Sequence, residues 1–409
     1  PPERPLNLVL IYLESFNEVL ADSDFYPGLT PNIQAMKKRY LSFENIYSSG
    51  YVTIEGIANS QCGTLFNMDH ANSSLVSRRG RLLNLPCLGD ILKTAGYHQY
   101  YLGGAELEFA GKGPFLREHG YDRVWGWEHW DDRGYERFND WGLSDTHLFN
   151  EAFDTIQELH GSSRPFNLTL LTLGMHTPGF VYDECPVYTE DPGKAFVNSI
   201  NCTDFLLGEF VKKLENSGVH EDTVLIMQSD QGSLLTPQII KQVGNRIRDT
   251  RLLTLMSLPD SRGITPGKLR LEAEGSNLNL VATLLDALDI SHNTHFVFSQ
   301  SHFQAEPEQP YYISRRQDFM DRQRVDNNRF HCEEPERDTP LSLPLDDCDK
   351  SRVMQAIAAL NLTYNPGTRE DNQICELDAR IDLDEKSGKL RVNWGNQNLT
   401  EQFYRRGSK

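Results

Sequence analysis

Long apolar runs are missing from this 409-residue sequence. No run approaches the roughly 20 residues that a transmembrane helix requires, and the longest candidates have the length of strands, namely Leu6–Leu13 and Leu168–Leu173. Low-complexity blocks and repeats of fixed period are also absent, which is typical of a soluble globular domain. No signal peptide is visible, and the chain opens on Pro-Pro-Glu-Arg-Pro. We therefore expect the sequence to be a trimmed soluble domain of a longer protein.

Basic residues are few. Lysine and arginine number 40 against 58 acidic residues, which gives a net charge of −18. Because nucleic-acid backbones are bound by clustered lysine and arginine, this balance argues against a nucleic-acid partner. It leaves a phosphate substrate open, since a bound metal ion can reverse the field inside a pocket.

The seven cysteines form no C-x-x-C pair, and no nearby histidine completes a zinc-finger spacing. A structural metal site is therefore not expected. The cysteines are grouped locally, as Cys62 with Cys87, Cys185 with Cys202, and Cys332, Cys348 and Cys375 near the end. This grouping favours short-loop disulfides in an oxidising compartment, with buried free thiols in a cytosolic enzyme as the alternative.

Apolar strand-like runs alternate with helical patterns over the first two-thirds of the chain. This alternation predicts an α/β fold with a mostly parallel central sheet and helices on both faces. The expected strands are Asn7–Leu13, Tyr97–Leu102, Asn167–Leu173, Thr223–Ser229 and Leu252–Ser257. The expected helices are Pro31–Tyr40, Leu88–Ala95, Asp145–His160, Val197–Ser217 and Asn277–Leu288.

The amino-acid composition changes after about residue 299, where proline and charged residues become frequent. We expect one catalytic domain over residues 1–299 and a smaller C-terminal α+β appendage, stapled by cysteines, over residues 300–409. Within the appendage, Lys350–Leu360 is predicted to be a short helix. Asp378–Trp394 alternates apolar and polar residues around a Glu-Lys-Ser-Gly turn, which predicts a hairpin.

Three of the expected strands run directly into polar residues. Glu14 follows the first strand, Asp230-Gln231 follows Thr223–Ser229, and His176 follows Asn167–Leu173 by a few residues. Function in open α/β sheets gathers at the carboxyl ends of the strands, so these residues are expected to share one site. Two acids and a histidine there can hold a hard metal ion and an anionic substrate. Taken singly, each residue also fits a helix cap, a structural histidine or a turn.

Thr53 lies in the glycine-flanked stretch Gly-Tyr-Val-Thr-Ile-Glu-Gly. At the start of a helix, free N–H groups and the helix dipole favour an incoming phosphate. A threonine hydroxyl becomes a nucleophile when a metal or a base activates it. The same stretch fits a threonine that only caps a helix, so both interpretations stay open on the local sequence.

The order of these features resembles the alkaline-phosphatase/sulfatase superfamily. A glutamate after the first strand precedes a threonine about forty residues later, and a His-x-Pro and a Ser-Asp-x-Gly stretch follow. Within the superfamily, the chain is similar to the lipoteichoic-acid-synthase-like branch, and to its phosphoglycerol transferases that act on periplasmic glucans. Supporting stretches include Ala-Asn-Ser-Gln-Cys-Gly at residues 58–63, His-Gly-Tyr-Asp at 119–122 and Asn-Asp-Trp-Gly at 139–142. The resemblance covers roughly residues 6–290.

The resemblance implies a role for each matching residue. Glu14, Thr53 and Asp230 would be metal ligands, and Thr53 would also be the nucleophile. His176 would contact the phosphoryl oxygens or protonate the leaving group, and Lys112 would bind substrate phosphate. Trp141 and Asp145 would shape the glycerol pocket. The implied disulfides join Cys62 to Cys87 and Cys185 to Cys202.

One departure from the family pattern falls in the expected metal site. Relatives have histidine as the fourth ligand where this chain has Gln231. An amide oxygen can still coordinate, as a harder and weaker ligand than imidazole. We expect one divalent ion, Mn²⁺ first, with Mg²⁺, Ca²⁺ and Zn²⁺ as alternatives. The departure also leaves open an inactivated variant or a glycan-binding paralogue. In such a paralogue six aromatic residues would stack on sugars, namely Phe25, Tyr26, Trp125, Trp127, Trp130 and Trp141.

The implied activity is transfer of phosphoglycerol through a covalent threonine intermediate. The donor would be phosphatidylglycerol or a substituted glucan, and the acceptor a hydroxyl of a periplasmic glucan. A phosphodiester hydrolase of the same fold would use the same residues and is the main alternative. A sulfatase is disfavoured, because no C/S-x-P-x-R motif surrounds Thr53. The expected location is the periplasm or another extracytoplasmic space, with a membrane anchor in the full-length protein.

Overall fold

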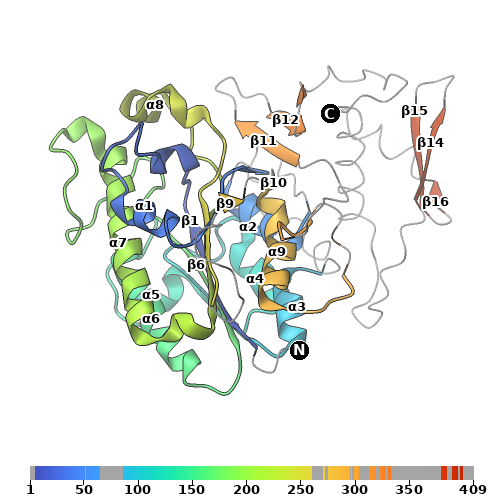
Figure 1. Ribbon diagram of the computed structural model, residues 1–409, viewed down its shortest axis with the longest axis horizontal. Helices are drawn as coiled ribbons and strands as arrows, with labels where there is room; N and C mark the ends of the chain where they lie inside the picture. Colours follow the sequence, from blue (N-terminus) through green and yellow to red (C-terminus); the bar gives the residue numbers. More distant parts are fainter. Residues whose placement is uncertain are drawn as a thin grey trace.

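Figure 1 shows the computed structural model, which describes residues 5–50, 52–64, 86–259, 275–294, 296 and 299–303, together with the backbone of the strands over residues 270–271, 313–317, 323–327, 330–332, 379–384, 389–394 and 397–398. Its centre is an eight-stranded sheet in the order β5-β4-β6-β1-β7-β8-β2-β9. These strands are β1 (Asn7–Leu13), β2 (Leu41–Phe43), β4 (His98–Gly103), β5 (Arg123–Trp125), β6 (Phe166–Leu171), β7 (Thr223–Ser229), β8 (Thr254–Ser257) and β9 (Arg270–Leu271).

Strand β1 lies at the middle of the sheet and pairs in parallel with β6 on one side and β7 on the other. Side chains alternate across a strand, so a strand buried on both faces is apolar throughout. Val9 and Ile11 of β1 belong to one hydrophobic cluster, whereas Leu8 and Leu10 belong to another. Each face of the sheet therefore carries its own core.

Helices cover both faces (Figure 1). One cluster contains residues of the helices α1 (Pro31–Lys37), α5 (Trp127–Asp132), α6 (Asp145–His160), α7 (Ala195–Ser217) and α8 (Pro237–Val243). The other contains residues of α2 (Thr53–Cys62), α3 (Leu88–Thr94), α4 (Lys112–Glu118) and α9 (Leu280–Leu288). None of the described helices is long and apolar enough to cross a membrane.

The mostly parallel α/β fold predicted from the sequence is confirmed. Strands β1 and β7 and helix α6 begin and end where they were expected, and the other elements predicted over residues 1–299 differ by a few residues at their ends. The strand expected at Leu252–Ser257 is shorter and runs antiparallel to β7. The helix expected at Asn277–Leu288 is split, because a 3₁₀ turn, η8 (Asn277–Asn279), precedes α9.

Short strands are also described outside the central sheet. Strands β10 (Gly275–Ser276) and β3 (Ile46–Tyr47) pair in parallel. Strands β11 (Ile313–Gln317), β12 (Gln323–Asn327) and β13 (Phe330–Cys332) form one antiparallel sheet. The predicted C-terminal hairpin is present as β14 (Ala379–Asp384) paired with β15 (Lys389–Trp394), and β16 (Gln397–Asn398) adds a third strand. The helix expected over 350–360 lies outside the described residues, and so do Cys348 and Cys375 of the expected staple.

Candidate active site

The carboxylates of Glu14 and Asp230 meet at the carboxyl edge of the sheet. Parallel pairing places Leu13 of β1 opposite Ser229 of β7, so the next residue on each strand is an acid. Both acids are buried, with 2% of Glu14 and 0% of Asp230 exposed. The Glu14 amide donates to Thr172 Oγ1 at 3.0 Å, which also ties the end of β1 to the end of β6. The strand-end arrangement expected from the sequence thus brings the two acids together.

Ser15 binds both carboxylates. Its amide donates to Asp230 Oδ1 at 2.9 Å, and its hydroxyl donates to Glu14 Oε1 at 2.6 Å. Its backbone has a φ of 55°, in the left-handed region that side chains other than glycine rarely adopt. The Gln231 amide also donates to Asp230 Oδ1, at 2.8 Å. One oxygen of each acid is thereby engaged by neighbouring protein groups.

Thr53 is the first residue of helix α2, and its hydroxyl donates to Glu14 Oε2 at 3.1 Å. The residue at the N-cap position is Val52, without a side-chain cap bond. Thr53 therefore does not cap the helix, and its hydroxyl faces the acid after β1. Gly56 allows α2 to approach β7 closely, because a Cβ at this position would lie 2.0 Å from the Asp230 carbonyl oxygen.

Two buried oxygens at this edge have no hydrogen-bond partner among the described residues, namely Asp230 Oδ2 and Gln231 Oε1. Burial raises the pKa of Asp230 well above its ordinary value, and the nearby charge of Glu14 raises it further. A buried acceptor left unpaired is costly, and two adjacent buried acids repel each other. A cation bound between them would relieve both penalties.

Lys112 begins helix α4 and is 4% exposed. Burial lowers its pKa to about 8, against the opposing influence of the negative charges of Glu14, Glu128 and Asp230. The side chain forms no ion pair with any residue in the described part of the chain. A buried ammonium in the field of the two site acids is suited to pairing with an incoming anion.

Asp145 is the first residue of helix α6 and holds the loop that carries His176. Its two carboxylate oxygens accept from the amides of Leu173 and Gly174, at 2.8 and 2.7 Å. Burial raises the pKa of Asp145 to about 7, although these two bonds act in the opposite direction. Both oxygens are thus occupied by backbone, so Asp145 acts on the shape of this loop.

His176 and Trp141 lie ring against ring, with centroids 4.1 Å apart. Trp141 also meets Phe109 edge to face at 5.3 Å, and Phe109 lies in the 3₁₀ turn η3 (Phe109–Gly111) just before Lys112. His176 Nδ1 approaches the Thr177 carbonyl oxygen at 3.1 Å. Within the described residues no hydrogen bond joins His176 directly to Thr53 or to either acid. The structure therefore shows a carboxylate–threonine cluster and a separate aromatic pair.

Sequence reasoning missed three residues that build the cluster. Ser15 and Gly56 are described above, and Asn277 donates from Nδ2 to the Asp230 carbonyl oxygen at 3.1 Å. Asn277 also accepts from the Ser49 amide at 3.0 Å, just before α2. The glycine spacing around Thr53 was a usable signal for Gly56. Nothing in the local sequence distinguishes Ser15 or Asn277 from ordinary turn residues.

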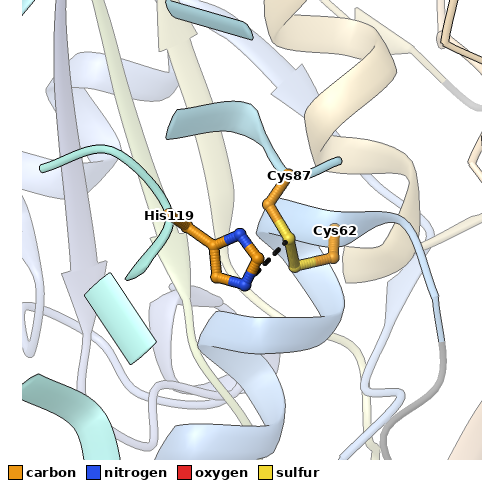
Figure 2. Close-up of side chains that lie close together, drawn as sticks. All are labelled: Cys62, Cys87 and His119. Atoms are coloured by element: carbon orange, nitrogen blue, oxygen red, sulfur yellow. Dashed lines mark hydrogen bonds between the residues drawn. A yellow bond between two sulfur atoms is a disulfide. The ribbon is translucent and has the colours of Figure 1, made fainter. Parts of the chain in front are cut away.

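The far end of α2 is tied down by a disulfide between Cys62 and Cys87, with an S–S distance of 2.00 Å (Figure 2). His119 lies beside it, with Nε2 3.8 Å from Cys87 Sγ and Nδ1 2.7 Å from Asp90 Oδ2. These two cysteines and His119 are the one group of three potential metal ligands of the His, Cys, Asp or Glu type that lie close together in the described part. Because the sulfurs are bonded to each other, we assign no metal to this group.

A second disulfide joins Cys185 to Cys202. Both disulfides use the cysteine pairs that the family resemblance implied. Among the aromatic residues considered for sugar stacking, Trp130 is fully buried and Trp127 is 6% exposed, so both belong to the core. Phe25 is 40% exposed and lies under the Arg246 guanidinium at 3.4 Å. The six aromatics therefore do not form one exposed stacking surface.

The α/β sheet with acids at its carboxyl edge has the architecture of the alkaline-phosphatase and sulfatase superfamily. A model of the Sulfatase family matches residues 6–290, and the chain belongs to this family. A phosphoglycerol transferase I from Xanthomonas euvesicatoria pv. vesicatoria (strain 85-10) is 34% identical over 302 residues, which cover 70% of this chain and 42% of the relative. The protein of the same name from Salmonella arizonae is 34% identical over 300 residues, which cover 70% of this chain and 38% of the relative. The chain thus spans about two-fifths of the length of these relatives.

Solved structures show the same fold. A protein in the alkaline phosphatase superfamily from Vibrio parahaemolyticus has a TM-score of 0.70 at 20% identity, covering 89% of this chain and 88% of its own. The lipoteichoic acid synthase LtaP from Listeria monocytogenes also has a TM-score of 0.70, at 17% identity, covering 88% of this chain and 93% of its own. The C-terminal periplasmic domain of EptC from Escherichia coli, in complex with zinc, has a TM-score of 0.54 at 17% identity, covering 76% of this chain and 90% of its own.

The residues at the sheet edge fit a divalent cation. One structural neighbour is a zinc complex. Asp230 Oδ2 and Gln231 Oε1, which have no hydrogen-bond partner among the described residues, accompany Glu14 Oε2 and the Thr53 hydroxyl. Carboxylate, hydroxyl and amide oxygens are donors that suit hard cations.

Proposed function

We propose that this chain is a metal-dependent phosphoglycerol transferase with Thr53 as its nucleophile. The observation that carries the proposal is the bond from the Thr53 hydroxyl to Glu14 Oε2, at the edge where Asp230 and Gln231 present unpartnered oxygens. Relatives named phosphoglycerol transferase I support the choice of the transferred group. The division into a catalytic domain over residues 1–299 and an appendage over residues 300–409 is part of this proposal.

In the first step, Thr53 Oγ1 attacks the phosphorus of a phosphodiester donor. The bond from phosphorus to the leaving alcohol breaks, and glycerophosphate becomes esterified to Thr53. The hydroxyl proton leaves toward Glu14, the acceptor that it already faces at 3.1 Å. In the second step, an acceptor hydroxyl attacks the same phosphorus, and the bond from phosphorus to Thr53 breaks. Glu14 returns its proton to the Thr53 oxygen, and the group that protonated the first leaving alcohol takes up the proton of the acceptor hydroxyl.

The other proposed site residues bind and protonate the substrate. Lys112 pairs with a non-bridging phosphoryl oxygen, which offsets the charge that develops there. His176 contacts another phosphoryl oxygen or gives the proton that the leaving alcohol needs. Trp141 forms one wall of the glycerol pocket, and Asp145 shapes it by holding the Leu173–Gly174 backbone.

We propose that Glu14, Thr53, Asp230 and Gln231 hold one divalent ion, with Mn²⁺ as the first choice. When bound, the ion lowers the pKa of the threonine hydroxyl and neutralises charge on the phosphoryl group. A buried amide oxygen without a partner at Gln231 supports a ligand at this position and speaks against a decayed site. Mg²⁺ and Ca²⁺ suit the same oxygen donors, whereas Zn²⁺ prefers nitrogen and sulfur.

The proposed donor is phosphatidylglycerol or an already substituted glucan, and the proposed acceptor is a hydroxyl of a periplasmic glucan. Two disulfides support an oxidising compartment such as the periplasm. A membrane anchor in the full-length protein would bring the site to a lipid donor. The relatives' names support phosphoglycerol as the transferred group, and the donor, the acceptor and the anchor rest on the family resemblance of the sequence.

The test is mass spectrometry of the chain after incubation with phosphatidylglycerol and Mn²⁺. We expect a glycerophosphate adduct on Thr53 in the wild type and none in Thr53→Ala, with transfer reduced by at least about a thousandfold. Thr155→Ala is a matched control, because the Thr155 hydroxyl donates to a helix carbonyl in α6, away from the acids. Equal turnover in Thr53→Ala and the control would refute the nucleophile assignment.

The products separate transfer from hydrolysis. A transferase gives substituted glucan when glucan is present and little free glycerophosphate. A phosphodiester hydrolase releases glycerophosphate at the same rate with and without glucan. A wild-type chain that binds no divalent ion would instead favour the glycan-binding alternative.

A further inference from the structure

Ser15 donates a hydrogen bond to each of the two acids of the cluster. Its hydroxyl donates to Glu14 Oε1 and its amide donates to Asp230 Oδ1. Its carbonyl oxygen accepts from the Ser233 hydroxyl at 2.5 Å, which ties the residue to the loop after β7. Ser15 is 6% exposed, so these bonds form away from bulk water.

These bonds divide the four carboxylate oxygens into two kinds. Glu14 Oε1 and Asp230 Oδ1 are held by Ser15, whereas Glu14 Oε2 faces Thr53 and Asp230 Oδ2 has no partner among the described residues. A carboxylate fixed through one oxygen presents the other in a defined direction. The other two oxygens, Glu14 Oε2 and Asp230 Oδ2, are therefore oriented before any ligand arrives.

We infer that Ser15 is a positioning residue that presents Glu14 and Asp230 to a divalent cation. The inference rests on the proposed metal site, but it does not depend on which group is transferred. Groups that orient metal ligands commonly change metal affinity about 10- to 100-fold when they are removed. In this chain one residue orients the acids that follow two neighbouring strands, β1 and β7.

The backbone of Ser15 allows a structural role to be separated from a positioning role. At a φ of 55°, glycine is unstrained and alanine is strained, and both lack the hydroxyl. Ser15→Gly and Ser15→Ala therefore remove the same bond to Glu14 Oε1, but they affect the stability of the backbone differently. Ser199→Ala is a matched control, because Ser199 is also buried and its hydroxyl donates to the Phe196 carbonyl oxygen in α7.

The experiment is calorimetric titration of each chain with Mn²⁺ alone, together with thermal melting in a chelator. We expect Ser15→Gly and Ser15→Ala to lose Mn²⁺ affinity equally, by about 10-fold or more. In the chelator, the melting temperature should be lower for Ser15→Ala than for Ser15→Gly. Ser199→Ala should keep the affinity of the wild type.

Three results would overturn the inference. Wild-type affinity in both Ser15 variants would show that the hydroxyl does not orient Glu14 for a cation. A loss of affinity in Ser15→Ala alone would mean that affinity follows backbone strain. A wild-type chain that binds no Mn²⁺ would remove the proposed metal site as well. By contrast, normal Mn²⁺ binding without an adduct on Thr53 would overturn the proposed function and leave the role of Ser15 intact.

Discussion

The interior of strand β1 and its carboxyl end are equally buried but chemically opposite. Residues Leu8–Leu13 are apolar apart from the Tyr12 hydroxyl, and all are 0% exposed. The next two residues, Glu14 and Ser15, are 2% and 6% exposed. Burial of the apolar interior stabilises the fold by roughly 25 cal/mol for each Å² of apolar surface removed from water. The same burial penalises the charged end, because an ionised carboxylate loses its hydration.

This contrast shows that the buried acids at the carboxyl end of β1 and β7 lower the stability of the fold, whereas the apolar interior raises it. Raised pKa values at Asp230 and Asp145 show that the metal-free edge favours protonated acids. The apolar interior carries no such desolvation cost, and it holds the strand ends at a fixed spacing. Binding of the proposed cation would offset the repulsion between the two acids. Three perturbations test the contrast, and the largest expected effect comes first.

A rise in pH should lower the free energy of unfolding through the ionisation of Asp145, a buried acid near the carboxyl edge of the sheet. Its pKa is raised to about 7 in the folded chain, so folding favours the protonated form. The stabilisation is fully present below the unfolded pKa of about 4 and is lost as the pH rises through about 7. The upper bound of this loss is roughly 4 kcal/mol. Urea unfolding at pH 5 and pH 8, with a chelator present, measures the part of this loss that falls between the two pH values, which is roughly 3 kcal/mol.

The matched variants for this measurement are Asp145→Asn and Asp131→Asn, the latter at an exposed position on α5. Asp145→Asn should show a smaller difference in unfolding free energy between the two pH values than the wild type. Asp131→Asn should show the wild-type difference. An unchanged pH dependence in Asp145→Asn would mean that other groups cause the pH dependence of the unfolding free energy.

Ile11→Ala should lower the stability of the fold without changing the affinity of the proposed site for Mn²⁺. Ile11 is 0% exposed and belongs to the cluster under α6 and α7. Removal of a buried isoleucine side chain leaves a cavity and should lower the free energy of unfolding by about 3 kcal/mol. The Mn²⁺ affinity of the folded protein should stay at the wild-type value, as measured by calorimetric titration. A parallel loss of affinity would show that the interior and the edge are energetically coupled.

Gln231→His should change the metal preference of the proposed site, and this is the smallest of the three expected effects. Imidazole nitrogen is a softer ligand than an amide oxygen, so the variant should bind divalent ions more tightly, with the gain largest for Zn²⁺. We expect the affinity for Zn²⁺ relative to Mn²⁺ to rise about tenfold, which corresponds to about 1.4 kcal/mol. Competition titration of the two ions measures the ratio. An unchanged ratio would mean that the side chain at 231 does not reach the cation.

Much of the fold was predictable because its signals are local. Strands β1 and β7 are continuous apolar runs, so their bounds were predicted without error. Helix α6 was predicted residue for residue, since Ser144 caps it and Gly161 follows it. The direction of β8 was not predictable, because nothing in a short apolar run indicates whether its neighbour runs parallel or antiparallel.

By itself, the sequence determined that acids follow β1 and β7, and that Thr53 lies where a helix begins. Only the tertiary structure decided that the Thr53 hydroxyl faces Glu14, 39 positions away, and does not cap α2. It also decided that Ser15 joins Asp230, 215 positions away, to Glu14. The physical reason is that a local pattern records burial and backbone preference, whereas the partner of a buried polar group depends on which strands the fold places side by side.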